Sequence, residues 1–200
     1  MDCRDCQKVW LELVDGTSRI LDTFTTNTHA YLVITPSSTF RLPLGQRRQK
    51  IIEQVVLGSS VKATAFDFGL AHSTTAIEVK LALEAMGSHG AKTKIPLALA
   101  MLVHAAHSQL PVAFERFSCF DAEDKLCNVL SAPIASVELS PAVREVVFLH
   151  AAGNSHAQIA TRRRTSRRTV ANQLATAFHR LGVSGRSGVL GYLALAPRSG

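Results

Sequence analysis

Five arginines stand close together in the last quarter of the chain, and guanidinium groups at this density suit the binding of phosphate. They are Arg162, Arg163, Arg164, Arg167 and Arg168. From Leu139 to Gly200 the chain has nine arginines and one acidic residue, a net charge of +8, whereas the whole chain carries +7. This concentration of charge favours contacts with the phosphates of a nucleic acid. The alternative is a solvated basic face on an ordinary helix bundle.

A polar stripe follows the cluster on a predicted helix. Ser166 can cap this helix, and Gly182 can end it after Leu181. One side of the helix is apolar, with Val170, Leu174, Ala177, Phe178 and Leu181. The neighbouring side carries Thr169, Gln173, Thr176 and Arg180. Short hydroxyl and amide side chains on an exposed helix suit contacts with base edges in a major groove.

Three more helices are expected to position that stripe. Pro141 to about Ala152 forms the first, because Ser140 can cap it and Gly153 can end it. A short helix runs from about Ser155 to Arg162, and residues 163–165 make the turn before the polar helix. A last helix covers about Arg186 to Ala196. Two helices joined by so short a turn have the spacing of a helix-turn-helix.

This stretch resembles the LuxR/FixJ-type (GerE-like) helix-turn-helix family. The matching elements, in order, are Leu139-Ser140, Glu145-Val146-Val147, Gly153-x-Ser155, Ile159-Ala160, Ser166-x-x-Thr169-Val170, Leu181-Gly182-Val183 and Ser184-x-Arg186. The resemblance implies a four-helix DNA-binding domain of a bacterial transcription regulator, whose third helix reads the major groove. It also implies that the fourth helix commonly mediates dimerisation. The chain departs from the family at Ala142-Val143, Ala157, Ala171 and Gln173, where charged or basic residues are usual.

Residue types and resemblance together predict a set of DNA contacts. We expect Thr169, Gln173 and Thr176 to face bases, the five clustered arginines to contact phosphates, and Ser166 to lie near the DNA backbone. The full predicted DNA-binding set is Ser155, Arg162, Arg163, Arg164, Thr165, Ser166, Arg167, Arg168, Thr169, Gln173, Thr176 and Arg180. Candidate homodimer contacts are Val189, Tyr192 and Leu193, for which packing in the protein core is an equal alternative.

An internal repeat relates the two halves of the chain. Adding 95 to a residue number places Ile51 and Ile52 on Val146 and Val147, Gly58 on Gly153, Ser60 on Ser155, Thr74 on Thr169, and Gly87 on Gly182. The same offset places Phe24 on Cys119, Tyr31 on Leu126, and Ile34 on Val129. Turn glycines and core positions are retained, as a shared backbone requires. Chance similarity between two helical segments is the alternative.

The predicted fold is therefore mainly α with small β-hairpins (α+β), in two tandem units. A first unit, residues 1–110, has a helix over Asp5–Val14, a hairpin of Arg19–Phe24 and Ala30–Thr35, and a degenerate helix-turn-helix module. A second unit, residues 111–200, has a hairpin over 114–130 and the helix-turn-helix module over 138–196. Residues 1–100 carry a net charge of only +2, so we expect the first unit mainly to pack, pair or position the second.

Other chemistry finds little support in the sequence. Cys3, Cys6, Cys119 and Cys127 could form a zinc site, but the spacing of the second pair favours free thiols in a reducing compartment. His104 and His107 lack a nearby acid, and we find no P-loop, dinucleotide fingerprint or catalytic triad. We expect no enzyme activity, cofactor or metal, no membrane span and a cytoplasmic location.

These observations favour a bacterial DNA-binding transcription regulator that reads double-stranded DNA. Its further partners would be a second copy of the chain or RNA polymerase. The rival interpretation is a protein-interaction module that binds another regulator or the transcription machinery without binding DNA. In that case the arginines would meet an acidic protein surface.

Overall fold

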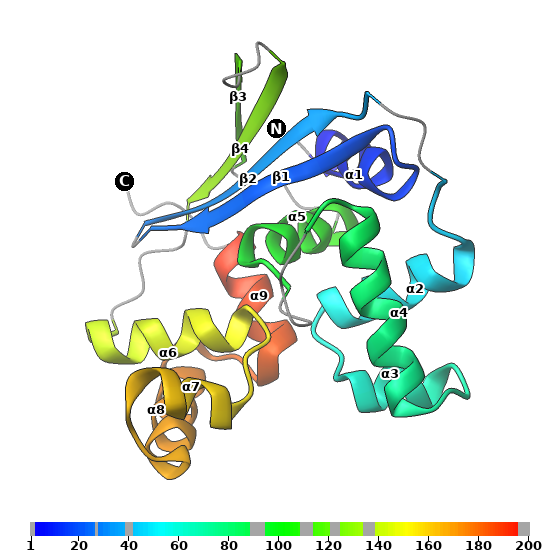
Figure 1. The fold of residues 1–200 in the computed structure, drawn as a ribbon. Coiled ribbons are helices and arrows are strands. Elements are labelled where there is room, and N and C mark those ends of the chain that lie inside the picture. The colour runs from blue at the N-terminus through cyan, green and yellow to red at the C-terminus, as the bar shows by residue number, and fades with distance from the viewer. Residues whose placement is uncertain are drawn as a thin grey trace.

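The computed structural model describes residues 3–26, 28–38, 42–88, 95–108, 114–120, 125–133 and 139–195 (Figure 1). The first half contains α1 (Cys3–Val14), β1 (Ser18–Thr25), β2 (His29–Pro36), α2 (Gln46–Val56), α3 (Val61–Asp67), α4 (His72–Ala85) and α5 (Leu97–Ser108). The second half contains β3 (Glu115–Phe120), β4 (Leu126–Pro133), α6 (Pro141–Ala151), α7 (His156–Arg163), α8 (Arg167–Leu181) and α9 (Gly185–Leu195). The predicted α+β fold, with each hairpin followed by helices, is confirmed.

The two hairpins form one antiparallel sheet with strand order β1-β2-β4-β3. The inner strands β2 and β4 join the predicted units, and Leu32 lies opposite Leu130 with Ala30 opposite Ala132. All four of these side chains are buried on the face that the helices cover. The predicted unit boundary at 110/111 lies outside the described residues, but the described parts of both units share one sheet and one apolar core.

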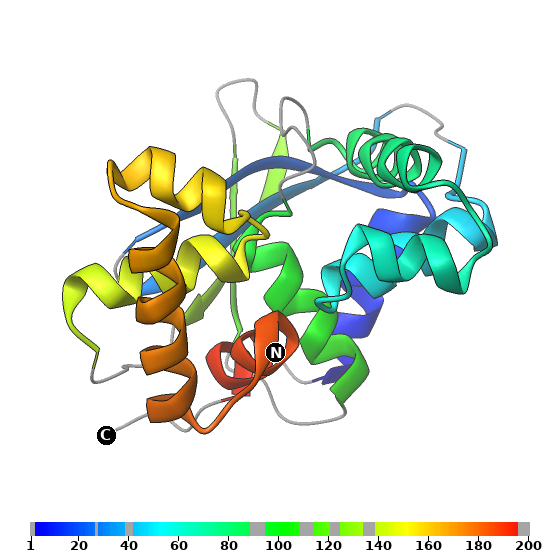
Figure 2. The same ribbon diagram turned by 90° about the horizontal axis from the view of Figure 1, so that it is seen from below.

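Helix α5 is the centre of that core. Its residues from Leu97 to Val103 are almost completely buried, as expected for a helix that is apolar on every side. It packs against α1, the sheet and α9. Figures 1 and 2 show α2–α4 on one side of the α5–α9 pair and α6–α8 on the other, and in Figure 1 the sheet lies across the top.

The predicted repeat holds for three helices of each unit. Helices α2, α3 and α4 begin at residues 46, 61 and 72, and α6, α7 and α8 begin at 141, 156 and 167, an offset of 95 each time. The fourth helices depart from this offset, because α5 begins at Leu97 and α9 at Gly185. Residue 196, the predicted end of α9, lies outside the described residues.

The offset also fails in the second strand of the hairpins. Ile34 is buried in the core, but its predicted counterpart Val129 lies opposite Val33 and Phe117, on the other face of the sheet. The residue opposite Ile34 on the core face is Asn128. A shift of one residue moves a side chain to the opposite face of a strand, so the repeat must slip by one residue within the hairpin.

Gly87 and Gly182 occupy equivalent positions but have different surroundings, which gives a testable difference. Both have a positive φ, +95° and +63° respectively. A Cβ on Gly87 would overlap the carbonyl oxygen of Ile20, whose N–H donates to Met86 O at 2.7 Å, whereas a Cβ on Gly182 would meet nothing within 4 Å.

We expect Gly87→Ala to lower the free energy of unfolding by about 3 kcal/mol, the sum of backbone strain and overpacking. Gly182→Ala carries the strain alone and should cost about 1 kcal/mol. Urea denaturation of the two variants measures the difference. Equal losses would show that helix α4 and strand β1 do not meet closely at this point.

Three described cysteines carry free thiols. Cys6 and Cys127 are buried and Cys119 is exposed. Cys119 lies opposite Cys127 between β3 and β4, on the edge strand of the sheet. Cys127 therefore packs as a buried side chain, whereas Cys119, which the repeat aligns with Phe24, is exposed. Among the described helices, none combines the length and apolar character that crossing a bilayer requires.

Candidate nucleic-acid interface

Local hydrogen bonds fix the two helices of the candidate interface. Ser155 caps α7, accepting from the N–H of Gln158 at 3.3 Å, while the Gln158 side chain accepts from the Ser155 N–H at 2.8 Å. Ser166 caps α8, and its Oγ accepts from the N–H of Thr169 at 3.0 Å. These reciprocal contacts satisfy backbone donors that a helix start otherwise leaves unpaired. The predicted cap at Ser166 is confirmed, whereas Ser140, the other predicted cap, precedes α6 without a side-chain hydrogen bond to the helix.

Most of the predicted DNA-binding residues lie exposed around the turn and along one side of α8. The exposed ones are Ser155, Arg162, Arg164, Ser166, Arg167, Arg168, Thr169, Thr176 and Arg180. Thr165 is half-buried in the turn. The guanidinium groups of Arg162, Arg164, Arg167 and Arg168 have no hydrogen-bond or ion-pair partner among the described residues. The structure thus brings several uncommitted guanidinium groups together at the start of α8.

Two features of this turn lower the stability of the folded chain when no ligand is bound. Arg164 adopts a left-handed conformation with φ 51°, the one positive φ among the described non-glycine residues, which costs about 1 kcal/mol. Arg167 and Arg168 occupy the first turn of α8, where the helix dipole disfavours cations. The same helix end offers backbone N–H groups to an anion. A bound phosphate would turn both arginines from a cost into a favourable contact.

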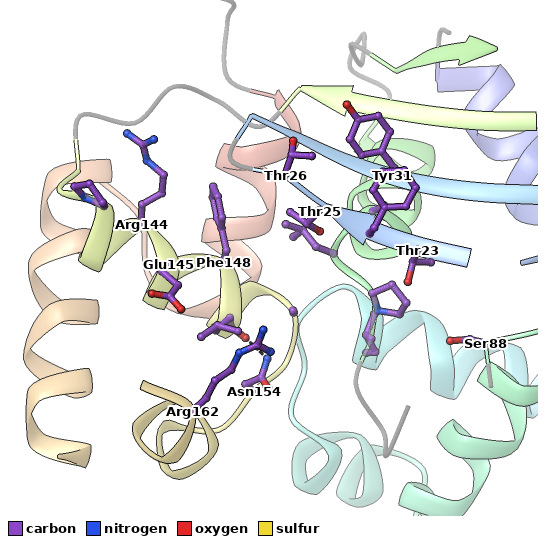
Figure 3. A pocket seen from close by; sticks show the side chains of 18 residues that line it. Thr23, Thr25, Thr26, Tyr31, Ser88, Arg144, Glu145, Phe148, Asn154 and Arg162 are labelled. Atoms are coloured by element: carbon purple, nitrogen blue, oxygen red, sulfur yellow. Dashed lines mark hydrogen bonds between the residues drawn. The ribbon is translucent and has the colours of Figure 1, made fainter. Parts of the chain in front are cut away.

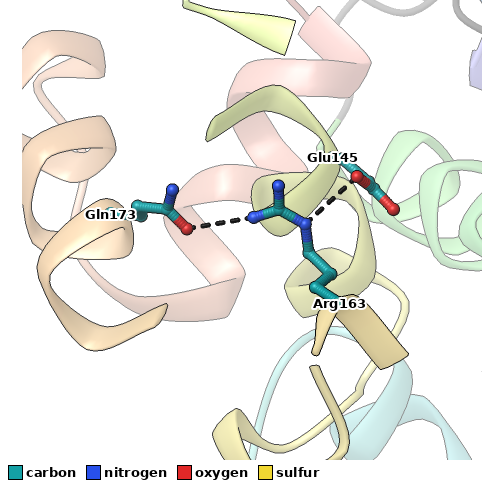
Figure 4. A network of polar contacts seen from close by, with 3 residues as sticks. All are labelled: Glu145, Arg163 and Gln173. Atoms are coloured by element: carbon teal, nitrogen blue, oxygen red, sulfur yellow. Dashed lines mark hydrogen bonds and ion pairs between the residues drawn. The ribbon is translucent and has the colours of Figure 1, made fainter. Parts of the chain in front are cut away.

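Arg163 does not share the exposed arrangement of its neighbours. Its Nε lies 3.1 Å from a carboxylate oxygen of Glu145, and its guanidinium donates to Gln173 Oε1 at 3.0 Å (Figure 4). Only 16% of its side chain is exposed. The Arg163 guanidinium thus joins α6 to α8 inside the domain and, unlike its neighbours in the cluster, is not free for the predicted phosphate contact in this arrangement.

Gln173 is correspondingly displaced from its predicted role. Gln173 is half-buried and its side-chain carbonyl oxygen accepts from Arg163, so its side chain does not lie on the most exposed side of α8. Asn172, which the sequence analysis passed over, is exposed at that level of the helix between Thr169 and Thr176. The Thr176 hydroxyl donates to Asn172 O at 3.0 Å. The spacing i, i+3, i+7 from Thr169 would have identified Asn172.

The proposed dimer contacts on α9 lie in the protein core. Val189 and Leu193 are buried, and Tyr192 packs against the same cluster. Helix α9 contacts α5, α6 and α8. This is the arrangement that the core-packing alternative predicts.

Arg186, also on α9, joins the two halves of the molecule. Its guanidinium donates to Ala151 O at the end of α6 at 2.8 Å and to Val55 O at the end of α2 at 2.9 Å. Burial lowers the pKa of Arg186 to about 10, so the group stays protonated at neutral pH. Helix carboxyl ends carry partial negative charge, which favours this cation. In the sequence, Arg186 stands out only through the family resemblance, because its contacts with α2 and α6 depend on tertiary structure.

The first unit presents a different surface where the second presents α7 and α8. Thr161, Asn172 and Thr176 correspond by the offset to Phe66, Ile77 and Leu81, which are 87%, 55% and 39% exposed. Two ion pairs lie on its helices, Arg48 with Glu78 and Lys80 with Glu84 at 3.6 Å. This face is apolar and near neutral, not basic.

His150 is a buried histidine whose protonation should make the stability of the second unit depend on pH. Both of its ring nitrogens are buried without a partner among the described residues. The ring lies near Phe178 and His156, with centroids 5.7 and 6.0 Å apart. Burial, with smaller contributions from His156 and Arg186, lowers the pKa of His150 to about 4.

Because the unfolded chain protonates His150 near pH 6.5, its stabilising neutral form is fully present above that pH. Stability should fall between pH 6.5 and pH 4 by about 2 kcal/mol, a value discounted because the ring is partly exposed. Urea denaturation against pH should show a flatter dependence for His150→Leu. His179→Gln, an exposed control on α8, should retain the wild-type slope. A wild-type slope in His150→Leu would contradict the assignment.

Comparison of the chain with protein-family models, curated proteins and solved structures finds no match. Any functional assignment therefore rests on the residues and geometry described above.

Proposed function

We propose that the chain is a DNA-binding transcription regulator that places α8 in the major groove of duplex DNA. The observation that carries the proposal is the group of uncommitted arginines at an exposed helix start. Arg162, Arg164, Arg167 and Arg168 would contact phosphates on either side of the groove. The backbone N–H groups at the start of α8 would add a further phosphate contact.

Base contacts would come from the outer face of α8. Thr169, Asn172 and Thr176 are exposed along it, and an α-helix fits the width of a B-DNA major groove. The Asn172 amide can pair with two atoms of an adenine edge, and threonine can contact the methyl group of thymine. Arg180 would reach the phosphate backbone from the far end of the helix. Gln173 would act indirectly, by holding Arg163.

One such module per chain gives modest affinity. The first unit offers no comparable basic face, so a second DNA contact would have to come from a second chain. The resemblance to LuxR/FixJ-type regulators supports this interpretation and a cytoplasmic site of action in bacteria.

The experiment is fluorescence anisotropy of a mixed-sequence duplex against the full chain over a range of salt. We expect binding at about 50 mM salt and a steep linear fall of log affinity with log salt, corresponding to several phosphate contacts. A failure to bind at that salt would overturn the proposal.

A second candidate function is protein binding through the first unit. The observation that favours it is the exposure of Phe66, Ile77 and Leu81 at positions equivalent to polar residues of the second unit. Exposed apolar side chains gathered on one element pair often mark interaction sites. A partner such as another regulator or RNA polymerase would use this face. Binding of RNA polymerase that Phe66→Ser abolishes, without loss of DNA binding, would support it.

A further inference from the structure

A cavity of about 850 Å³ lies between the β1–β2 hairpin and α6 (Figure 3). Side chains of β1 and β2 form one wall and side chains of α6 the other, and Arg162 reaches it from α7. The start of α5 contributes the apolar residues Ile95, Pro96 and Leu97. Its size is within the range of small-molecule sites.

The apolar part of the cavity suits a flat ligand body. Phe148 and Leu149 line it from α6, and Ile95, Pro96 and Leu97 line it beside the start of α5. Phe24 and Tyr31 also border it, but their pair lies between the pairs Thr23–Leu32 and Thr25–Ala30, so their rings project from the other face of the sheet. Apolar side chains that line a concave site lose solvent contact when a ligand enters, which favours binding.

The charged side chains of the cavity favour a ligand of one sign of charge. Arg162 lines it and has no hydrogen-bond or ion-pair partner among the described residues. Glu145 also lines it, but its carboxylate is paired with Arg163. The acidic group is therefore already neutralised, while a basic group is available. An anion gains a charge-assisted contact there, and a cation would meet uncompensated positive charge.

We propose that this cavity binds a small organic anion with a flat apolar body. The body lies against Pro96, Phe148 and Leu149, and the anionic group pairs with Arg162. The hydroxyl groups of Thr23 and Thr25, on the opposite wall, are available to the polar end of the ligand.

Ligand binding in the cavity should weaken DNA binding at the candidate interface. This consequence rests on the proposed function. Arg162 is one of the predicted phosphate contacts, and one guanidinium cannot serve both anions fully. Ligand and DNA therefore compete, and by linkage each lowers the affinity of the other by the same factor. The chain Glu145–Arg163–Gln173 gives the cavity wall a second connection to α8.

The first test is fluorine NMR of 4-fluorophenylacetate added to the full chain, with neutral 4-fluorophenylacetamide as the control ligand. We expect the carboxylate to bind at least tenfold more tightly than the amide. Arg162→Gln should remove that preference, whereas Arg167→Gln, an equal loss of charge outside the cavity, should retain it. Equal binding of the two ligands, no binding of either, or equal effects of the two variants would overturn the proposal.

The second test measures duplex affinity with and without saturating 4-fluorophenylacetate. We expect a several-fold weakening in the wild-type chain and none in Arg162→Gln. An unchanged wild-type affinity overturns the competition while leaving the cavity assignment to the NMR result. Absence of any DNA binding overturns the proposed function and the competition together, and the NMR result then still decides whether the cavity binds anions.

Discussion

Replacing Arg167 and Arg168 with alanine should weaken binding to every duplex and reduce the slope of log affinity against log salt by about one to two. Both side chains are exposed in the first turn of α8 and uncommitted to any described partner. Each phosphate contact releases about one counterion, so losing two contacts changes the slope by that amount. Since phosphate contacts carry no sequence information, the loss should be uniform across sequences.

The matched control for this pair is Arg4→Ala with Lys8→Ala, which removes the same charge from the exposed side of α1. That variant should change the slope by much less, because its charges lie across the molecule from α8 (Figure 1). Equal slopes in the two variants would mean that net charge alone governs binding. The stability of the Arg167/Arg168 variant should be unchanged or slightly raised, since the helix dipole disfavours those cations.

Replacing Arg186 with methionine should lower the free energy of unfolding by about 3 kcal/mol. The substitution removes the bonds to Ala151 O and Val55 O; Ala151 O loses its guanidinium donor in a buried position, whereas Val55 O keeps the bond from the Gly58 N–H at 3.2 Å. Methionine retains most of the length and apolar surface of the arginine stem, so the loss reports the guanidinium contacts. Thermal or urea denaturation measures it directly.

Arg180→Met is the control, because Arg180 is exposed on α8. Its substitution should change stability by no more than about 0.5 kcal/mol. A loss below about 1 kcal/mol for Arg186→Met would contradict the view that this residue ties α2, α6 and α9 together. The same contacts imply that residues 139–195 separated from the first half would lose α5 and Val55, so functional tests should use the whole chain.

The sequence was a good guide to elements and a poor guide to their partners. Glycines at turns, serine caps and apolar spacing located the helices and both hairpins, because these signals are local. The joining of β2 to β4 was not predicted, because alternation along a strand indicates which face is buried and not which strand lies beside it. The same limit applies to Val189 and Leu193, whose spacing indicated a buried face without showing that α5 covers it.

The candidate site shows this limit at single residues. Thr169 and Thr176 are exposed, as expected for one helical face that follows the cap at Ser166. The neighbouring residues 172 and 173 differ in exposure through tertiary contacts, among them the bond from Arg163 to Gln173 Oε1, which the sequence pattern does not show. Arg163 looked like its neighbours in the cluster, and its pairing with Glu145, eighteen residues earlier, depends on tertiary structure.

The most direct test of the central claim is an NMR titration of the full, isotope-labelled chain with a mixed-sequence duplex at low salt. The claim predicts that backbone amide shifts change from Arg162 through Arg180, most strongly near Ser166 and Thr169, and that α3 and α4 are unaffected. Changes concentrated on α3 and α4, or on the sheet, would contradict it, because the DNA contact would then lie outside α7 and α8.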